Sequence, residues 1–284
     1  MGKNVYITPP ATLGRETMRP GDNQLVDLTS LPCAHRSLMR EESRIKAEIH
    51  AFEDFLDRLN EDPPQPYRTD GGTKPTTLQT QTPTTTASLD AVQTAYQETV
   101  LAVDHWEEAY GKETTGESIA NEFGPDVAAG LAGGVETWTS LLWNQLRAET
   151  TDSIETRRRC HQTVVAERQR IESLSDSLAV SGDELARIER ADYPFDDRSD
   201  RLSAIQHQLE WLAEEEQEHL RQYERSKTDL LSTLVYADLD TDFPGLAAIA
   251  TAQDIRDSIE VRHWGGMIQS NSANLPFQAR EEIN

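Results

Sequence analysis

The sequence is short of long apolar runs and of cysteine. Its longest apolar run, Val127 to Val135, has nine residues, mostly alanine and glycine, whereas a helix that spans a bilayer needs ~18. The two cysteines, Cys33 and Cys160, are too few for a disulfide framework. The first residues lack the apolar core of a signal peptide. We therefore expect a soluble protein of the cytoplasm.

Lysine is also scarce, because the 27 basic residues comprise 22 arginines and only five lysines. Aspartate and glutamate number 50, which gives a net charge of −23 spread over the whole chain. A surface this acidic repels duplex nucleic acid and anionic membranes. The composition resembles that of proteins from salt-loving archaea, where a Debye length of roughly 3 Å at about 1 M salt screens carboxylate repulsion. We expect a fold that requires salt; an acidic regulatory protein of a mesophile is the alternative.

The N-terminal part predicts one amphipathic helix between two irregular segments. Residues 1–31 carry prolines and glycines without a period, which predicts an irregular leader. Residues 61–88 are rich in threonine and proline, which predicts a disordered linker. Between them, residues 32–60 predict a helix with a single apolar stripe. The stripe consists of Leu38, Ile45, Ile49, Phe52, Leu56 and Leu59, and it either folds back on its own chain or binds a partner.

The middle of the chain predicts a compact cluster of short helices. A helical pattern begins at Leu89 and closes near Tyr110, and a short helix follows it through Ile119. Residues 124–126 (Gly-Pro-Asp) predict a further helix start, because proline suits the first helical position. Gly133 and Gly134 predict its end.

Two long helices, 137–191 and 198–236, dominate the rest of the predicted helical domain, which spans residues 89–264. The connection between them is short, so they are expected to form an antiparallel hairpin, with a break in the first near Gly182. Residues 246–263 predict a final short helix, and residues 265–284 an irregular tail. No strand pattern occurs, so the expected fold is all-α: a long antiparallel hairpin, a cluster of short helices and a separate N-terminal heptad helix.

Several segments together resemble a family of haloarchaeal, coiled-coil-rich helical proteins of unknown function. They are AYQETV at 95–100, HWEEAYG at 105–111, EFGPD at 122–126, YADLDTDFP at 236–244 and FEDF at 52–55. The likeness covers about residues 35–262. It departs at residues 133–138, where a proline is expected to open the long helix. What the resemblance implies is source and architecture, since the family has no established activity to carry over.

The spacing Glu-x-x-His occurs twice, at Glu216 with His219 and at Glu260 with His263. Residues three apart share a helix face, and two such pairs with two further carboxylates form the di-metal site of ferritin-like bundles. Glu48 or Glu107 is the candidate for the additional carboxylate. The alternative reading is a solvated helix face. Cys33 with His35 and Cys160 with His161 lack the spacings of structural zinc sites.

Two further clusters have both a structural and a functional reading. Arg157, Arg158 and Arg159 form a basic cluster, which we expect to contact acids of the return helix (Glu214, Glu215, Glu218) or of another subunit. Tyr96, Trp106, Tyr110 and Phe123 lie near His105, Glu107 and Glu108 in sequence. Such aromatic residues build either a core or a ligand pocket.

These observations favour a non-enzymatic interaction or scaffolding protein of a halophilic archaeon. The six stripe residues of 32–60 are the candidate partner-binding surface, and the expected partner is another helical protein or a second copy. We expect no cofactor, no membrane partner and no nucleic-acid partner. A ferritin-like di-metal enzyme, using Glu216, His219, Glu260 and His263, and a transcription-associated regulator remain alternatives.

Overall fold

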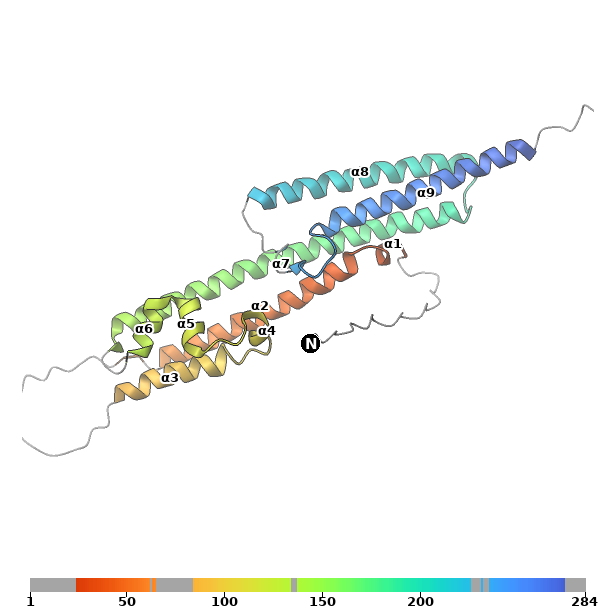
Figure 1. The fold of residues 1–284 in the computed structure, drawn as a ribbon. Helices are drawn as coiled ribbons and strands as arrows, with labels where there is room; N and C mark the ends of the chain where they lie inside the picture. The colour runs from red at the N-terminus through yellow and green to blue at the C-terminus, as the bar shows by residue number, and fades with distance from the viewer. Residues whose placement is uncertain are drawn as a thin grey trace, which may run out of the picture. The chain divides into compact units, whose positions relative to one another are not determined.

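The computed structural model describes residues 24–61, 63–64, 84–133, 137–225, 231 and 235–273, and within them it contains nine helices and no strand (Figure 1). The all-α prediction is confirmed. No helix in the described ranges is both long and apolar enough to cross a membrane. Most of the predicted leader and linker (residues 1–23 and 65–83) lies outside the described residues. The helices are α1 Gln24–Asp27, α2 Leu31–Glu61, α3 Thr84–Thr99, α4 Trp106–Tyr110, α5 Thr115–Phe123, α6 Pro125–Ala132, α7 Ser140–Glu189, α8 Phe195–Arg225 and α9 Pro244–Ala273.

The chain divides into two compact units. The short-helix unit consists of the described parts of residues 32–174 and 221–243. The three-helix unit consists of the described parts of residues 1–31, 175–220 and 244–284. Helix α7 contributes its residues up to 174 to the first unit and its remaining residues to the second.

In the short-helix unit, α2 and α7 run antiparallel, because Glu42 pairs with Arg168 while Glu48, further along α2, pairs with Arg157. The short helices α3 to α6 lie beside this pair (Figure 1). Each fully buried leucine or phenylalanine contributes roughly 1.5–3 kcal/mol to stability. The core cluster is Phe52, Phe55, Leu59, Leu89, Val92, Ala95, Tyr96, Val100, Trp106, Ile119, Phe123, Val127, Leu131, Trp138, Leu142, Leu146 and Ile154.

The apolar stripe of α2 faces the inside of its own unit. Its members Leu38, Ile45, Phe52 and Leu59 are buried, and Ile49 and Leu56 are half-buried against the core cluster. The stripe was predicted either to fold back on its own chain or to bind a partner. In the structure it folds back, because α2 packs on α7 of the same chain. The N-terminal helix is therefore not a separate element, because its stripe is largely covered within the monomer.

Local signals explain the short helices. Thr114 and Glu117 form a capping box at the start of α5, in which each side chain accepts a hydrogen bond from the other residue's backbone N–H. Gly124 joins α5 to α6 with φ of 89°, a conformation that favours glycine. Pro125 then occupies the first turn of α6, as predicted.

The predicted helix from Leu89 to Tyr110 is instead two helices. Helix α3 ends at Thr99, where the N–H groups of Val100 and Leu101 both donate to the carbonyl of Tyr96, at 2.9 and 3.1 Å. The turn that follows carries Leu101 and Val103 against the core cluster. This burial favours the turn over a straight continuation of the helix. Helix α3 also begins at Thr84, inside the predicted linker.

In the three-helix unit, α7, α8 and α9 contact one another. Arg201 on α8 pairs with Glu184 on α7, which confirms the antiparallel hairpin, and Arg262 on α9 pairs with Glu189 on α7 at 2.6 Å. Phe195 at the start of α8 stacks on His263 of α9, with ring centroids 4.2 Å apart. Helix α8 is described to Arg225, so the predicted end at 236 lies beyond it, past residues that are not described.

Three glycines do not act as the sequence predicts. Gly182 does not break α7, because the side chain of Leu25 packs against its bare Cα and fills the space of a missing side chain. Gly265 and Gly266 do not end α9, which runs to Ala273. Among the described glycines only Gly111 and Gly124 have positive φ, so these three keep a helical conformation. Glycine in a helix costs only about 1 kcal/mol relative to alanine, which packing elsewhere offsets.

Candidate functional site

A largely enclosed polar site of the short-helix unit is centred on Glu48. This α2 residue is only 6% exposed, and its carboxylate has three partners. Arg157 Nε donates to Oε2 at 2.8 Å, the Tyr110 hydroxyl donates to the same oxygen at 3.0 Å, and His105 Nε2 lies 3.0 Å from Oε1. A buried carboxylate needs such partners, because burial without them costs several kcal/mol.

Arg157 joins this carboxylate to a second one. Its two terminal nitrogens donate to Glu122 of α5 at 2.6 and 3.1 Å, a bidentate contact. Its guanidinium also lies over the ring of Phe52, 4.1 Å from the centroid. We name Glu48, His105, Tyr110, Glu122 and Arg157 the Glu48 network. It links α2, α4, α5, α7 and the turn before α4.

The surroundings shift the ionisation of the network in consistent directions. Burial alone would lower the pKa of Arg157, but the hydrogen bonds and charges of Glu122 and Glu48 outweigh it, so its pKa is raised and it stays charged. Burial, followed by the charge of Glu48, raises the pKa of Tyr110 and keeps its hydroxyl a donor. The network therefore acts as a set of closed charge pairs.

From the sequence, Glu48 is predicted only as a possible metal ligand, and Arg157 as part of a basic cluster and as a residue on the apolar register of the long helix. A signal for their pairing was nonetheless present. Glu48 lies three residues after Ile45 and four before Phe52, on the same face of its helix as the apolar stripe. Arg157 lies three residues after Ile154, on the apolar face of the long helix. An acid and a base on the apolar faces of two helices predict a pair only once the register is known.

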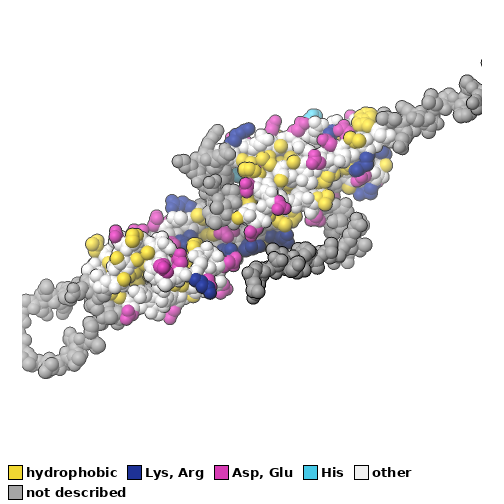
Figure 2. All heavy atoms as spheres, in the orientation of Figure 1, with side chains coloured by type: hydrophobic (Ala, Val, Ile, Leu, Met, Phe, Trp, Pro, Cys, Tyr) yellow, Lys and Arg dark blue, Asp and Glu magenta, His cyan; other side chains and the backbone are white. Residues whose placement is uncertain are grey.

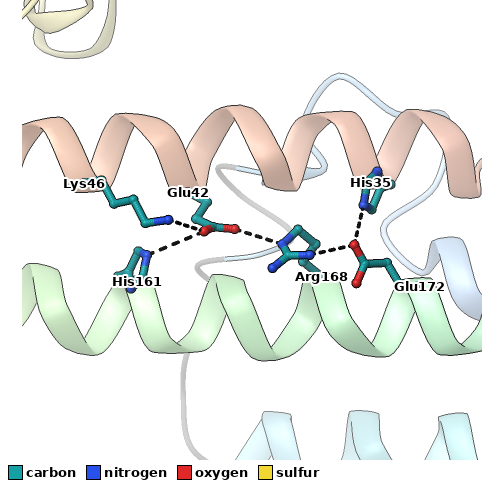
Figure 3. Close-up of polar contacts among 6 residues, drawn as sticks. All are labelled: His35, Glu42, Lys46, His161, Arg168 and Glu172. Atoms are coloured by element: carbon teal, nitrogen blue, oxygen red, sulfur yellow. Dashed lines mark hydrogen bonds and ion pairs between the residues drawn. The ribbon is translucent and has the colours of Figure 1, made fainter.

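A second set of charges, the α2–α7 ladder, follows the surface of the same two helices (Figure 3). Glu42 Oε2 accepts from Arg168 at 2.8 Å, and Arg168 also donates to Glu172 at 2.6 Å. His35 Nε2 lies 2.8 Å from Glu172. Lys46 donates to Glu42 at 2.5 Å, while His161 Nε2 lies 3.9 Å from Glu42, too far for a hydrogen bond.

The ladder favours ionised carboxylates. The hydrogen bond from Lys46, followed by that from Arg168, lowers the pKa of Glu42. The hydrogen bond with His35, followed by that from Arg168, lowers the pKa of Glu172. His35 and His161 thus have carboxylate neighbours, while Cys33 is exposed and accepts a hydrogen bond from Arg36 at 3.1 Å. The described contacts of the two Cys/His pairs therefore point to ion pairs.

The basic cluster is held by acids other than those predicted. Arg158 donates to Glu53 of α2 at 2.7 Å and to Glu155 of α7 at 2.8 Å. The acids of Arg157 come from α2 and α5. The expected acidic contact exists, but these partners lie in the short-helix unit rather than at residues 214–218.

Three of the four aromatic residues predicted to cluster build the core, whereas Tyr110 is 42% exposed and lies outside the core cluster. Tyr96, Trp106 and Phe123 are buried, and Tyr96 and Phe123 pack edge to face with centroids 5.7 Å apart. Burial raises the pKa of Tyr96, whose hydroxyl is 3.0 Å from that of Ser118. The neighbouring acids lie at the surface, where Glu107 pairs with Lys112 and Glu108 with Arg44. The ring cluster itself is filled by side chains.

The two Glu-x-x-His pairs lie on different helices and far apart: Glu216 and His219 are on α8, and Glu260 and His263 are on α9. Glu216 packs against Gly245, in the first turn of α9, whereas Glu260 and His263 are about fifteen or more residues further along the same helix, roughly 22 Å away. Glu260 pairs with Arg256 at 2.8 Å and His263 stacks on Phe195. His219 lies half-buried on α8.

The candidates for the additional metal ligand have other partners. Glu48 belongs to the Glu48 network, and Glu107 pairs with Lys112 at 3.0 Å. Across the part of the chain that the structure describes, no three His, Cys, Asp or Glu side chains converge as metal ligands would. The two Glu-x-x-His pairs therefore have the spacing of metal ligands, but the fold does not bring them together.

Comparison with known proteins supplies a family but no activity. No curated protein and no solved structure matches the chain. One family model, described as a domain of unknown function (DUF7260), matches residues 29–259, from the turn before α2 into α9. These residues include the Glu48 network, the α2–α7 ladder and the first Glu-x-x-His pair, Glu216 with His219, but not Glu260 or His263. Because the match covers most of the sequence, the chain belongs to the DUF7260 family.

Proposed function

We propose that this protein is a non-enzymatic interaction protein of a salt-rich archaeal cytoplasm, and that it associates with a second copy through α7 and α8 of the three-helix unit. The observation that carries the proposal is the exposure of Trp211 on α8 and Val180 on α7, at 58% and 66%. Large apolar side chains left in water are typical of interaction surfaces when they gather beside a groove.

A groove of about 370 Å³ lies between these helices. Val180 on α7 and Ala204, Ile205 and Gln208 on α8 line it. Trp211 follows Gln208 by one helical step of three residues, so it extends the same flank of α8. In addition, hydrophobic side chains gather over α8 and α9 on the face shown in Figure 2. The three-helix unit thus offers apolar surface to another helix.

The charges beside the groove suit a second copy of the chain. Arg187 and Arg201 provide two positive charges, and Asp183 and Glu184 provide two negative charges. A two-fold interface needs a patch that complements itself, and a patch with both signs meets this requirement. The net charge of −23 opposes association at low salt, but molar salt screens this long-range repulsion.

The non-enzymatic part of the proposal is supported by the closed Glu48 network. Glu48 already has three partners, and Arg157 and Glu122 hold each other through two hydrogen bonds. A general base or nucleophile instead needs a free atom within reach of a substrate. The charged groups at the centre of this unit are engaged in holding helices together.

Sedimentation of the full chain in about 2 M KCl tests the proposal. We expect the wild type to form dimers and Trp211→Glu to weaken the dimer at least tenfold, because it places a charge in an apolar contact. Leu141→Glu is the matched control, since Leu141 is also highly exposed but lies in the short-helix unit. A monomeric wild type, or equal effects of both variants, contradicts the proposal.

The salt requirement is read in the same samples by circular dichroism. We expect helicity to be incomplete in low salt and to rise toward molar KCl as carboxylate repulsion is screened. Full helicity without added salt contradicts the halophilic part of the proposal and leaves the dimer result to stand separately.

A further inference from the structure

We infer that the short-helix unit holds a binding site for a small organic anion with an apolar body, at a cleft between α2 and the turn before α4. The cleft has a volume of about 680 Å³, within the usual range of small-molecule sites. One side is a face of α2 that includes Arg40, Ser43 and Arg44, and the other includes Val103 and His105. This site is separate from the proposed dimer groove.

Positive charge is unusual in this acidic chain, yet two guanidinium groups flank the cleft one helical turn apart. Like charges at this spacing destabilise a helix slightly, so each normally has an acidic partner. Arg44 has one, Glu108 at 2.6 Å, in a pair whose glutamate is exposed and whose arginine is half-buried. Arg40 is exposed and makes no direct hydrogen bond or ion pair within the described residues, although its charge acts on Glu41 and Glu108 nearby. An anion bound beside the two arginines would give Arg40 a direct hydrogen-bonded partner.

The polar end of the cleft is held in a fixed geometry. His105 lines the cleft, and its Nε2 lies 3.0 Å from the buried carboxylate of Glu48. Glu48 is itself fixed by Arg157 and Tyr110. This contact holds the imidazole in one orientation at the edge of the cleft. A preorganised wall of this kind lowers the entropy lost on binding.

The remaining lining favours a ligand that is not a bare inorganic ion. Met39 is 54% exposed at the cleft, and Val103 is half-buried there. Asp104 also lines the cleft and disfavours ligands of high negative charge. A single carboxylate or phosphate group on a short aliphatic or aromatic body fits these features best, with the head group at the arginines and the body over Met39.

Titration calorimetry on the full chain tests this site, at the lowest KCl concentration that keeps its helicity. Hexanoate is the probe, hexanol tests the apolar body alone, and inorganic phosphate tests the charge alone. We expect saturable binding of hexanoate and at least tenfold weaker binding of hexanol and phosphate. Phosphate binding equal to that of hexanoate overturns the apolar part of the inference, and hexanol binding equal to it overturns the anionic part.

Variants locate the site. Arg40→Gln with Arg44→Gln is expected to weaken hexanoate binding about tenfold or more, because it removes both charge-assisted donors. Arg36→Gln is the matched control: Arg36 is an exposed arginine one turn earlier on α2 that does not line the cleft. Circular dichroism confirms the fold of each variant. No saturable binding to the wild type, or equal losses in the double variant and the control, overturns the inference.

Discussion

The two units of this chain differ in whether their tryptophans are buried or exposed to solvent. In the short-helix unit, Trp106 and Trp138 are buried, and the indole N–H of Trp143 donates to the carbonyl of Leu59 at 3.0 Å. In the three-helix unit, Trp211 and Trp264 remain largely exposed. One unit therefore encloses its tryptophans, while the other leaves its tryptophans available for contact.

Buried charge differs between the units as well. The short-helix unit places an acid and a base in its interior and pairs them across helices, as Glu48 and Arg157 show. In the three-helix unit the buried Glu216 lies at the start of α9, where the positive end of the helix dipole favours a carboxylate, and the buried Arg256 pairs with Glu260 of its own helix. The first arrangement fixes which helices pair and in which register, whereas the second anchors the end of one helix.

The largest effect is expected from opening the Glu48 network. Arg157→Met leaves Glu48 and Glu122 without their shared cation, and breaking a buried pair in this way costs about 3–5 kcal/mol. We expect a large fall in thermal stability in molar KCl. Hydrogen exchange read by mass spectrometry is expected to show the loss in α2 and the first part of α7.

The control for this variant is Glu189→Gln, which removes the exposed pair with Arg262 in the three-helix unit. Exposed pairs contribute only about 0–1 kcal/mol, so little change is expected. If both variants lose similar stability, the buried Glu48 network stabilises its unit no more than an exposed ion pair does. The proposed difference between the two units is then wrong.

The sequence patterns predicted the positions of the helices better than the contacts between them. The stripe from Leu38 to Leu59 predicted α2 almost to the residue, because apolar periodicity is a local property. Glycine predictions failed at Gly182, since whether a helix tolerates glycine depends on what packs there, and Leu25 is remote in sequence. Local signals do not contain that information.

The candidate site was only partly predictable for the same reason. His105 and Tyr110 stood out in sequence, but their partner Glu48 lies about sixty residues earlier, on another helix. The spacing of Glu216 and His219 looked like a metal motif, yet the second motif lies on α9 about fifteen residues beyond Gly245, the residue that Glu216 contacts. Motifs within one helix are visible in a sequence, whereas convergence of several helices depends on their register.

An intermediate effect is expected at the start of α9. A Cβ placed on Gly245 meets the carboxylate of Glu216, which is buried and has little room to move. Gly245→Ala is therefore expected to destabilise the three-helix unit by about 1–3 kcal/mol, measured by thermal unfolding. Gly265→Ala, in open space on the same helix, is expected to stabilise it by about 0.4–1 kcal/mol. Equal behaviour of the two variants argues against Glu216 as the anchor of α9.

The smallest effect is expected from the α2–α7 ladder, because its charges lie near the surface. The pKa of Glu42 and that of Glu172 are lowered below the ordinary value of 4.5, so their contribution to stability is present above about pH 4.5 and is lost as pH falls through the folded-state values. Glu42→Gln is expected to be slightly less stable than the wild type near neutral pH. At acidic pH the difference is expected to vanish, since the wild-type carboxyl is then also neutral.

Thermal unfolding of both proteins across this pH range measures the difference. Lys46 and Arg168 stay charged throughout, and His35, His161 and Glu172 are present in both proteins, so the Glu42 carboxylate is the only ladder group that differs between them. Repeating the series at higher KCl is expected to shrink the gap near neutral pH, because salt screens exposed pairs more than buried ones. A stability difference that persists at acidic pH means that Glu42 stabilises the α2–α7 contact through packing of its methylene groups. Its ion pairs with Lys46 and Arg168 would then contribute little.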